Sequence, residues 1–312
     1  MLKNSRANAV LTALSGRSSM LRDDLLFPNG VGTKWRKLQH LRDGSDVTGV
    51  VTMGGPFSNH LHAVAVFGRM HDIATVGLVR GEHVDFGNPT LAFCQRAGMQ
   101  LYAVRKADFD QGLQSAAVLA LVAQHPLYTW LAMGGDSVGG RAGAATLVAE
   151  CTAQLPADQG VQFIVGAGSG TTARGIASAL TPLQHCIAVP AAMIHGLDQG
   201  PCAASDDVAD GDRTPLWLPP PLEGYAELPA ARLRTIETVW AEHGVVLDPI
   251  YVSRAMVALR HVQSPDSMVH SVVVHTGGLQ GWAGMSHVVV SAGLRTAIDE
   301  ALHSAFGLAP RQ

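Results

Sequence analysis

Short apolar runs alternate with longer helical patterns along this 312-residue chain, and this alternation limits the fold more than any other feature. A strand followed by a helix and then another strand pairs in parallel, and parallel sheets are covered by helices on both faces. The sequence therefore predicts an α/β fold. The expected strand and helix pairs are 47–53 with 58–70, 75–79 with 90–97 and 162–165 with 172–180, followed by a strand at 271–275.

Two lobes are expected, because the chain is longer than a single hydrophobic core usually supports. A helical pattern over 139–155 ends in a polar break at 156–160, and a second crossing is expected just after Lys37. Residues 1–40 and 156–312 are thus predicted to form a larger lobe that binds the cofactor, and 41–155 a smaller inserted one. Residues 199–221, rich in Asp, Pro and Gly, are expected to be a long loop, either a lid or plain surface.

Composition excludes several classes of protein. The net charge is −3 and no basic stripe is interleaved with aromatic residues, so a nucleic-acid partner is not expected. No apolar stretch approaches the roughly 20 residues that span a bilayer, so no membrane partner is expected either. The four cysteines form no zinc-spaced group, and residues 1–20 lack the apolar core of a signal peptide. A soluble, cytoplasmic enzyme without a metal is expected.

Lys34 is one of only four lysines and follows a glycine, in the run Gly32 to Leu38. A chain so poor in lysine does not use it as general surface charge, so Lys34 is a candidate for imine chemistry.

The run Gly166 to Thr172 follows an expected strand and precedes a helical pattern. Its glycines permit positive φ, and the free N–H groups of a helix start bind phosphate. The alternative is that the glycines serve only a tight turn. A nucleotide-binding oxidoreductase is disfavoured, because Ala173 breaks the GxGxxG spacing, no lysine completes a Walker A loop, and residues 186–192 contain no Asp or Glu.

A second glycine turn runs from Met53 to His60. Ser58 is a good helix N-cap, which alone would explain the turn. The functional alternative is that this helix start receives a substrate carboxylate while Asn59 reaches a ring hydroxyl. His60 and His62 point apart on a helix, so they predict no metal site and are expected to be solvated or to lie behind the site.

Tyr225 and Tyr251 are two of four tyrosines, and each lies at an element boundary. They are either core tyrosines with satisfied hydroxyls or proton relays whose pKa is lowered by a nearby cation.

Three segments together suggest a ligand that has an amine-reactive group, a phosphate and a ring. They are Lys34, the glycine run at 166–172 and the segment His275 to Gly278. Pyridoxal phosphate has these three parts.

These segments, in this order, resemble the family of D-cysteine desulfhydrase and 1-aminocyclopropane-1-carboxylate deaminase, in its shorter form. The resemblance implies a two-lobed fold-type II pyridoxal-phosphate enzyme, similar to the tryptophan synthase β subunit, with an open, mostly parallel sheet covered by helices in each lobe. The matching stretches are Arg22 to Leu25, Gly32 to Leu38, Gly54 to His60, Gly168 to Thr172, Gly224 and Tyr225, Leu247 to Tyr251, and His275 to Gly281.

The resemblance also implies a role for each site residue, and a homodimer. Lys34 would bind the cofactor covalently and later move the substrate Cα proton. Ser58 and His60 would meet the substrate, with Tyr225 and Tyr251 across the ring as further catalytic candidates. The expected cofactor-binding residues are Lys34, Asn59 at the 3′-oxygen, Gly168, Ser169, Gly170, Thr171 and Thr172 at the phosphate, and Thr276 at the ring nitrogen.

Thr276 and Val252 distinguish branches of the family, because the deaminase branch has leucine and glutamate at the matching positions. A neutral Thr276 leaves the ring nitrogen largely unprotonated, which weakens the electron sink and suits loss of a β-leaving group. Thr33 stands in place of a usual asparagine, and Val252-Ser253-Arg254 replaces a usual Thr-Gly-Lys. Residue 252, which the resemblance places beside the substrate, therefore lacks the family's hydroxyl.

The sequence therefore predicts a pyridoxal-phosphate lyase that carries out α,β-elimination of a small amino acid, as D-cysteine desulfhydrase does, and gives a 2-oxo acid and ammonia. The alternatives are a 1-aminocyclopropane-1-carboxylate deaminase, an amino-acid racemase, or a protein that binds pyridoxal phosphate without turnover.

Overall fold

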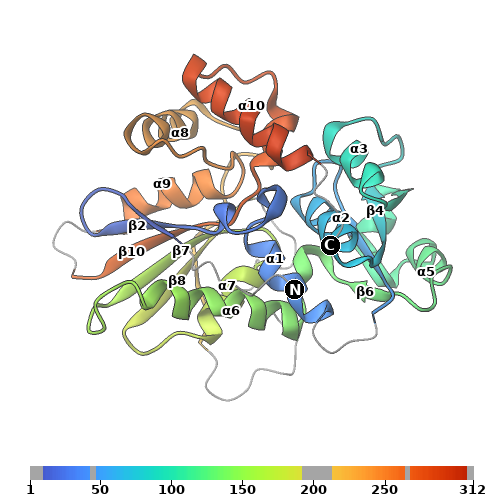
Figure 1. Cartoon of the computed structure of the whole chain (residues 1–312), viewed down its shortest axis with the longest axis horizontal. Coiled ribbons are helices and arrows are strands. Elements are labelled where there is room, and N and C mark those ends of the chain that lie inside the picture. The colour runs from blue at the N-terminus through green and yellow to red at the C-terminus, as the bar shows by residue number, and fades with distance from the viewer. Residues whose placement is uncertain (1–9, 43–46, 192–212, 264–267, 308–312) are drawn as a thin grey trace. The chain divides into compact units, whose positions relative to one another are not determined.

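The computed structural model describes residues 10–42, 47–191, 213–263 and 268–307 (Figure 1). The chain divides into two compact units, and each unit contains one sheet. Unit 1 comprises Met1–Phe27 and Ala144–Gly277, and unit 2 comprises Pro28–Gly143 and Gly278–Gln312. These units differ from the expected lobes, since residues 28–40 and 278–312 group with unit 2 and residues 144–155 group with unit 1. Which lobe binds the cofactor stays a prediction.

The sheet of unit 1 has the strand order β1-β2-β10-β7-β8-β9 among the described residues. Only the edge pair β1 and β2 is antiparallel, and the other neighbours pair in parallel. Its strands are β1 Leu11–Ala13, β2 Ser18–Arg22, β7 Val161–Ala167, β8 Gln184–Pro190, β9 Leu216–Trp217 and β10 His270–His275.

Helices cover both faces of this sheet, because its central strands are apolar on both sides. Phe163 and Val165 of β7 pack with Ile176 of α7 and Leu147 of α6 on one face. Helix α9 packs on the other face, as Figure 1 shows. The helices that contribute to unit 1 are α6 Val138–Thr152, of which residues 144–152 belong here, α7 Thr171–Ser178, α8 Ala230–His243 and α9 Val252–Val262.

The sheet of unit 2 has the order β5-β4-β3-β6, with every pair parallel. Its strands are β3 Gly49–Gly54, β4 Ala74–Arg80, β5 Gln100–Val104 and β6 Thr129–Leu131. The helices that lie wholly in unit 2 are α1 Thr33–Leu38, α2 Asn59–His71, α3 Pro89–Arg96, α4 Lys106–Gln111, α5 Ala116–Val122 and α10 Ala292–Phe306.

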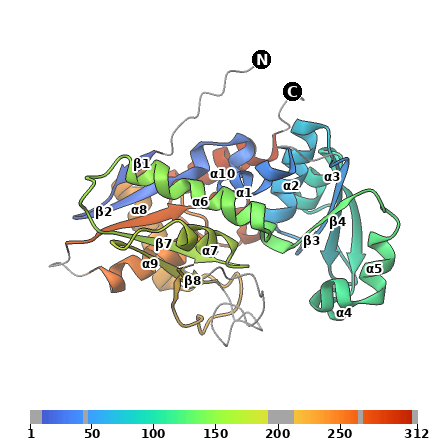
Figure 2. The ribbon, with the colours of Figure 1, turned by 90° about the horizontal axis from the view of Figure 1, so that it is seen from below.

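Alternation along β4 places helices on both faces of this sheet as well. Leu78 packs with Phe109 of α4 and Val118 of α5. Gly77 points to the opposite face, where an added Cβ would lie 3.2 Å from Leu61 of α2. Figure 2 shows α2 and α3 on one side of β3 and β4, and α4 and α5 on the other.

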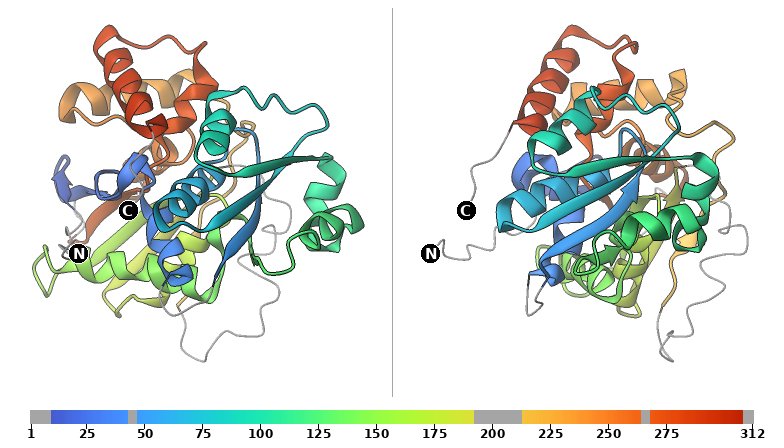
Figure 3. Two further views of the ribbon diagram at one scale, coloured as in Figure 1. Left: turned by 45° about the vertical axis from the view of Figure 1, so that its right-hand side comes forward. Right: turned by 90° about the vertical axis from the view of Figure 1, so that its right-hand side faces the viewer.

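Helix α10, red in Figure 3, packs on α3 within unit 2. Its last turn is held by side chains from early in the chain, because Asn29 Nδ2 donates to Ala305 O over 3.2 Å and His62 Nε2 lies 2.9 Å from the same oxygen. This docking explains why residues 278–312 belong to unit 2.

The predicted α/β fold is confirmed, including parallel sheets covered by helices. Each expected strand and helix pair is present within a few residues, as β3 with α2, β4 with α3, β7 with α7, and β10 alone. One prediction is wrong in part, because Leu216–Trp217 forms β9 within the segment expected to be an irregular loop. Residues 199–212 of that segment lie outside the described residues. No helix in the described ranges is long and apolar enough to cross a membrane.

The sheet core of unit 2 predicts a contrast between two leucines. Leu78 is fully buried, whereas Leu127 is 80% exposed. We expect Leu78→Ala to lower the free energy of unfolding by about 2–5 kcal/mol, because the buried methyl groups leave a cavity. Leu127→Ala, the same change at the surface, should have almost no effect. Urea unfolding of both variants measures this, and equal losses would contradict the packing described.

Candidate functional site

The start of α7 in unit 1 has the geometry of an anion site. Strand β7 ends at Ala167 and α7 begins at Thr171, one residue before the expected start. Gly170 has φ of 77°, and no side chain among the described residues caps this helix. The first N–H groups of α7 are therefore left for a ligand, with the positive end of the helix dipole behind them. Ser169 Oγ and Thr171 Oγ1 lie 2.8 Å apart at the same turn.

Two glycines of this turn have a packing role that a tight turn alone does not explain. A Cβ on Gly166 would lie 2.4 Å from Tyr251 O, and one on Gly168 would lie 3.2 Å from Cε1 of the Tyr251 ring. The predicted phosphate turn and the predicted catalytic tyrosine are thus packed directly against each other.

Arg174 and Trp217 also belong to this turn, and the sequence analysis missed both. Arg174 Nη2 donates to Ser169 O over 3.0 Å, which brings a positive charge to the turn. A Cβ on Gly170 would lie 2.7 Å from Cη2 of Trp217. The Trp217 Nε1–H group is buried with no hydrogen-bond partner among the described residues. Arg174 follows Gly170 by one helical turn, so its place at the turn could have been predicted from the sequence. No local sequence feature indicates that Trp217 lies there.

Tyr225 and Tyr251 are brought together, with their hydroxyls 3.0 Å apart and their rings at 64°. Tyr225 is 52% exposed, so the core alternative is wrong for it. Burial, and then the neighbouring Tyr225, raises the pKa of Tyr251 well above its usual value. This direction excludes, for Tyr251, the alternative of a relay whose pKa is lowered by a nearby cation. Tyr251 therefore keeps its proton at neutral pH.

Thr276 follows β10 directly and is 8% exposed. Because β10 pairs in parallel with β7, Thr276 lies at the same sheet edge as the α7 turn, where ligands of such sheets bind. His275 Nε2–H donates to Val246 O over 2.9 Å and orients the strand end.

Arg22 and Asp24 lie at the end of the neighbouring strand β2. Burial raises the pKa of the Asp24 carboxyl, but His275 and Arg22 beside it outweigh burial and hold the pKa below its usual value. Arg22 donates to both carboxylate oxygens, over 2.8 and 2.7 Å.

In unit 2, Lys34 lies in α1 directly after the left-handed Gly32 and Thr33, and it is partly buried. Lys37 lies one turn further along, is 4% exposed, and donates from Nζ to Gly134 O over 2.6 Å. Of the two lysines in this helix, Lys34 is the more accessible to a ligand.

Ser58 caps α2, since its Oγ accepts from the N–H groups of His60 and Leu61 over 3.2 Å. The capping interpretation is confirmed, and the substrate role of Ser58 stays a prediction. Asn59 is 7% exposed, and its Oδ1 has no hydrogen-bond partner among the described residues. A buried amide oxygen without a partner is costly, so it fits a residue that faces a ligand.

His60 has a defined tautomer. The Thr52 hydroxyl donates to Leu131 O over 2.7 Å, so it must accept from His60 Nε2–H over 2.8 Å. His60 Nδ1 therefore carries a lone pair. Burial lowers the pKa of His60 to about 3, and the charges of Lys37 and Lys34 lower it in the same direction. His60 can only accept a hydrogen bond through Nδ1.

His62 is fully buried, and its Nε2–H donates to Ala305 O. Burial lowers its pKa to about 4, Lys34 adds to this, and the bond to Ala305 opposes it. Of the two expected alternatives, solvation is thus wrong for both histidines, and a place behind the site stays a prediction. No group of three metal-ligating side chains occurs in the part of the chain that the structure describes.

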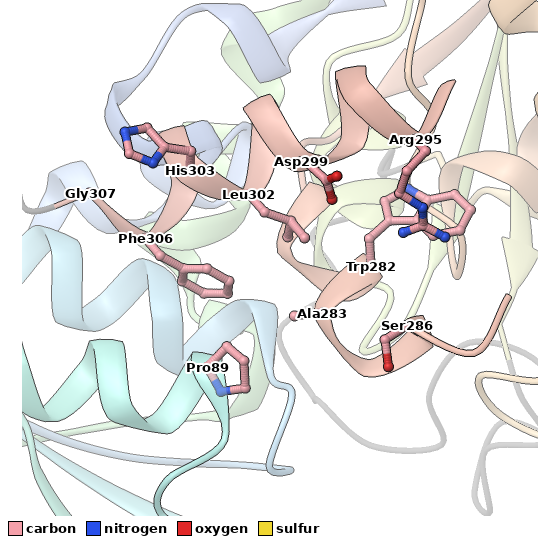
Figure 4. Close-up of a pocket in the computed structure, with 10 residues that line it drawn as sticks. All are labelled: Pro89, Trp282, Ala283, Ser286, Arg295, Asp299, Leu302, His303, Phe306 and Gly307. Carbon is pink, nitrogen blue, oxygen red and sulfur yellow. The ribbon is translucent and has the colours of Figure 1, made fainter. Parts of the chain in front are cut away.

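A separate pocket of about 550 Å³ lies in unit 2, where Arg295, Asp299 and His303 follow one side of α10 (Figure 4). It contains none of the predicted site residues. The predicted site residues lie at the helix starts of α2 and α7 and in α1, outside this pocket.

Known proteins of similar sequence and fold support the resemblance to pyridoxal-phosphate enzymes, although no family model matches the chain. A Thermotoga maritima protein provisionally named 1-aminocyclopropane-1-carboxylate deaminase is 25% identical over 297 residues, which are 86% of this chain and 91% of that protein. The sequence similarity and the motif order support a fold-type II pyridoxal-phosphate enzyme related to 1-aminocyclopropane-1-carboxylate deaminase and D-cysteine desulfhydrase.

Solved structures agree with this family's fold. The crystal structure of a deaminase homologue superposes with a TM-score of 0.68 at 20% identity over 85% of both chains. A pyridoxal 5′-phosphate-dependent aspartate racemase superposes with a TM-score of 0.58 at 14% identity over 87% of this chain and 90% of that one. At these identities the superpositions establish the fold-type II architecture alone.

The two buried histidines predict acid destabilisation. Below pH 6.5 the unfolded chain takes up protons at His60 and His62, whereas the folded chain does so only near pH 3 and 4. Stability should therefore fall as the pH drops from 6.5 toward 4, by about 1.4 kcal/mol per pH unit for each histidine. Urea unfolding from pH 7.5 to 4.5 measures this. His60→Gln should flatten the slope, and the exposed control His83→Gln should leave it unchanged. A slope unaffected by His60→Gln would refute the assignment.

Proposed function

We propose that this chain, a pyridoxal-phosphate enzyme by its relatives, is a lyase that eliminates a β-substituent from a small amino acid. Water then completes the release of ammonia and a 2-oxo acid. The family resemblance supports the cofactor and the enzyme class, and the identity of the leaving group is the proposal.

The structural observation that supports binding of the cofactor is the start of α7, which no side chain among the described residues caps, with left-handed Gly170 ahead of it. Backbone N–H groups without side-chain competitors suit a phosphate dianion. Gly168, Ser169, Gly170, Thr171 and Thr172 would hold the phosphate, with the Arg174 charge nearby. The close packing of Gly168 on Tyr251 leaves no side chain in the way.

Asn59 and Thr276 would hold the ring. The Asn59 amide, whose Oδ1 has no partner among the described residues, fits a polar group of the ring. Thr276 at the end of β10 offers a neutral hydroxyl to the ring nitrogen. This assignment rests on the family's motif order and on the geometry of each residue in its own unit.

Bound pyridoxal phosphate would supply the electron sink that stabilises negative charge at the substrate Cα. The Lys34 amine would anchor the cofactor and, once displaced by the substrate amine, take the Cα proton. Ser58 would offer its hydroxyl proton to the substrate. His60, which is neutral with a bare Nδ1, would accept a hydrogen bond there.

Tyr251 is proposed as a proton donor, because its raised pKa keeps the phenol protonated. The 3.0 Å contact links it to Tyr225, which is exposed enough to exchange protons with water. The pair would thus return protons to the departing group or to the product carbon.

Two features bear on the substrate. Thr276 and Val252 favour elimination of the D-cysteine type, because a neutral partner at the ring nitrogen gives a weaker sink. The name of the Thermotoga relative favours 1-aminocyclopropane-1-carboxylate as the alternative. Racemisation is an alternative of the same kind, and Thr276 and Val252 argue against it as well. Binding of the cofactor without turnover would follow if the altered segment Val252 to Arg254 has changed the substrate wall.

A homodimer in a reducing compartment such as the cytoplasm is also proposed. The family resemblance supports the dimer. Cys94, Cys151 and Cys186 are free and buried, and burial raises the pKa of each thiol to about 12, so they suit a reducing environment.

Product analysis tests the proposed reaction. The purified protein is incubated with D-cysteine, L-cysteine or 1-aminocyclopropane-1-carboxylate. We expect pyruvate, ammonia and sulfide from a cysteine, with D-cysteine preferred. Lys34→Ala should lower kcat by about 100-fold or more, whereas the exposed control Lys106→Ala should not change it. Formation of 2-oxobutanoate alone would establish the alternative, and absence of every product would contradict both.

The phosphate turn predicts a contrast between two glycines of unit 1. Gly170 and Gly244 have φ of 77° and 63°, so alanine is strained at either, by roughly 1 kcal/mol. A Cβ at 170 also meets Trp217, whereas a Cβ at 244 meets nothing within 4 Å. We expect Gly170→Ala to raise the Kd for pyridoxal phosphate about tenfold or more, equivalent to ~1.4 kcal/mol. Gly244→Ala should leave the Kd unchanged, and equal effects on Kd would contradict the assignment.

A further inference from the structure

Two buried arginines meet one glutamate in unit 1. Arg232 of α8 and Arg254 of α9 are 3% and 5% exposed. The Nη1 groups of both donate to Glu223 Oε1, over 2.7 and 2.6 Å. Loss of Glu223, whose side chain is 30% exposed, would remove the carboxylate partner of two buried arginines, so the contact fixes the segment that precedes α8.

Asp248 completes this charge cluster, which consists of Glu223, Arg232, Asp248 and Arg254. Burial and the adjacent Arg254 lower the pKa of Arg232 to about 10, while Glu223 and Asp248 oppose this. Arg232 therefore stays protonated at neutral pH. Two positive charges face two negative charges.

The charge cluster holds the turn that carries Tyr225. Arg232 Nη2 donates to the carbonyl of Glu227, and the Glu227 carboxylate accepts from the Gly224 N–H over 3.0 Å. Tyr225 thus lies between anchored residues. Ala226 has φ of 64°, a conformation that a residue with a Cβ rarely adopts, so the turn depends on external restraint.

Asp248 holds the other tyrosine. Its Oδ1 accepts from the N–H groups of Ile250, Tyr251 and Val252. The backbones of both tyrosines are therefore attached to one cluster. Since the Tyr225 side chain is 52% exposed, the turn rather than side-chain packing sets its position.

We propose that this charge cluster positions the Tyr225 hydroxyl against Tyr251, so that Glu223, Arg232 and Arg254 are positioning residues for the tyrosine pair. Its effect on turnover rests on the proposed function, whereas its effect on the position of Tyr225 does not. Arg254, where the resembling family has lysine, contacts Glu223 through Nη1 alone.

Tyrosine NMR tests the positioning directly, because the chain has only four tyrosines. The protein is labelled at Tyr Cζ, and signals are assigned with single Tyr→Phe variants. We expect Glu223→Gln to shift the Tyr225 and Tyr251 signals and to leave those of Tyr102 and Tyr128 in unit 2 unchanged. Arg254→Lys should cause smaller shifts than Arg254→Met. Unchanged Tyr225 and Tyr251 signals in a folded Glu223→Gln protein would overturn the inference.

A double-mutant cycle tests the consequence for turnover. Glu223→Gln alone should lower kcat about tenfold, with KM nearly unchanged, because the phenol is misplaced. In a Tyr225→Phe background the same change should have no further effect. Losses that multiply would mean that the cluster does not act through Tyr225 and would overturn the inference. A wild-type protein with no turnover would count against the proposed function, and the NMR measurement would then decide the positioning alone.

Discussion

The close approach of the Tyr251 backbone to Gly166 is the contact on which the rest of unit 1 depends. The carbonyl of Tyr251 lies where a side chain on residue 166 would begin, only 2.4 Å from the ideal Cβ position. Any other residue there would move the start of α9 away from the end of β7. The predicted phosphate turn would then separate from the Tyr251 ring that packs on Gly168. The glycines therefore join a predicted anion site to a predicted proton donor.

In unit 2, nearby charges and one hydroxyl set the protonation state of His60. Lys34 and Lys37 lie one turn apart on α1, and their charges help to keep His60 neutral. The Thr52 hydroxyl then fixes which nitrogen of His60 carries the proton. A protonated His60 would repel the lysine amine and the amine of a substrate. The buried chain from Leu131 to Thr52 to His60 thus prepares an acceptor beside a helix start that is already capped by Ser58.

The periodicity of the chain was enough to predict the fold class and the strand–helix pairs around Ser58 and Gly168, because those signals are local. It also placed Tyr225 and Tyr251 at element boundaries, though not their contact. Periodicity did not predict the contacts that join residues far apart in the sequence. Trp217 touches Gly170 across 47 positions, and Glu223 binds Arg254 across 31. Burial of the two histidines also depends on distant partners. His60 contacts Thr52 of β3, and His62 contacts Ala305 of α10. The direction of the Tyr251 pKa likewise follows from burial, which no spacing reveals.

The central claim is that Lys34 is the lysine that binds pyridoxal phosphate, and peptide mapping tests it most directly. The protein is saturated with the cofactor, reduced with borohydride, digested and analysed by mass spectrometry. The account predicts a phosphopyridoxyl group on Lys34, with no modification of Lys3, Lys37 or Lys106. Modification of another lysine, or of none after saturation, would contradict it.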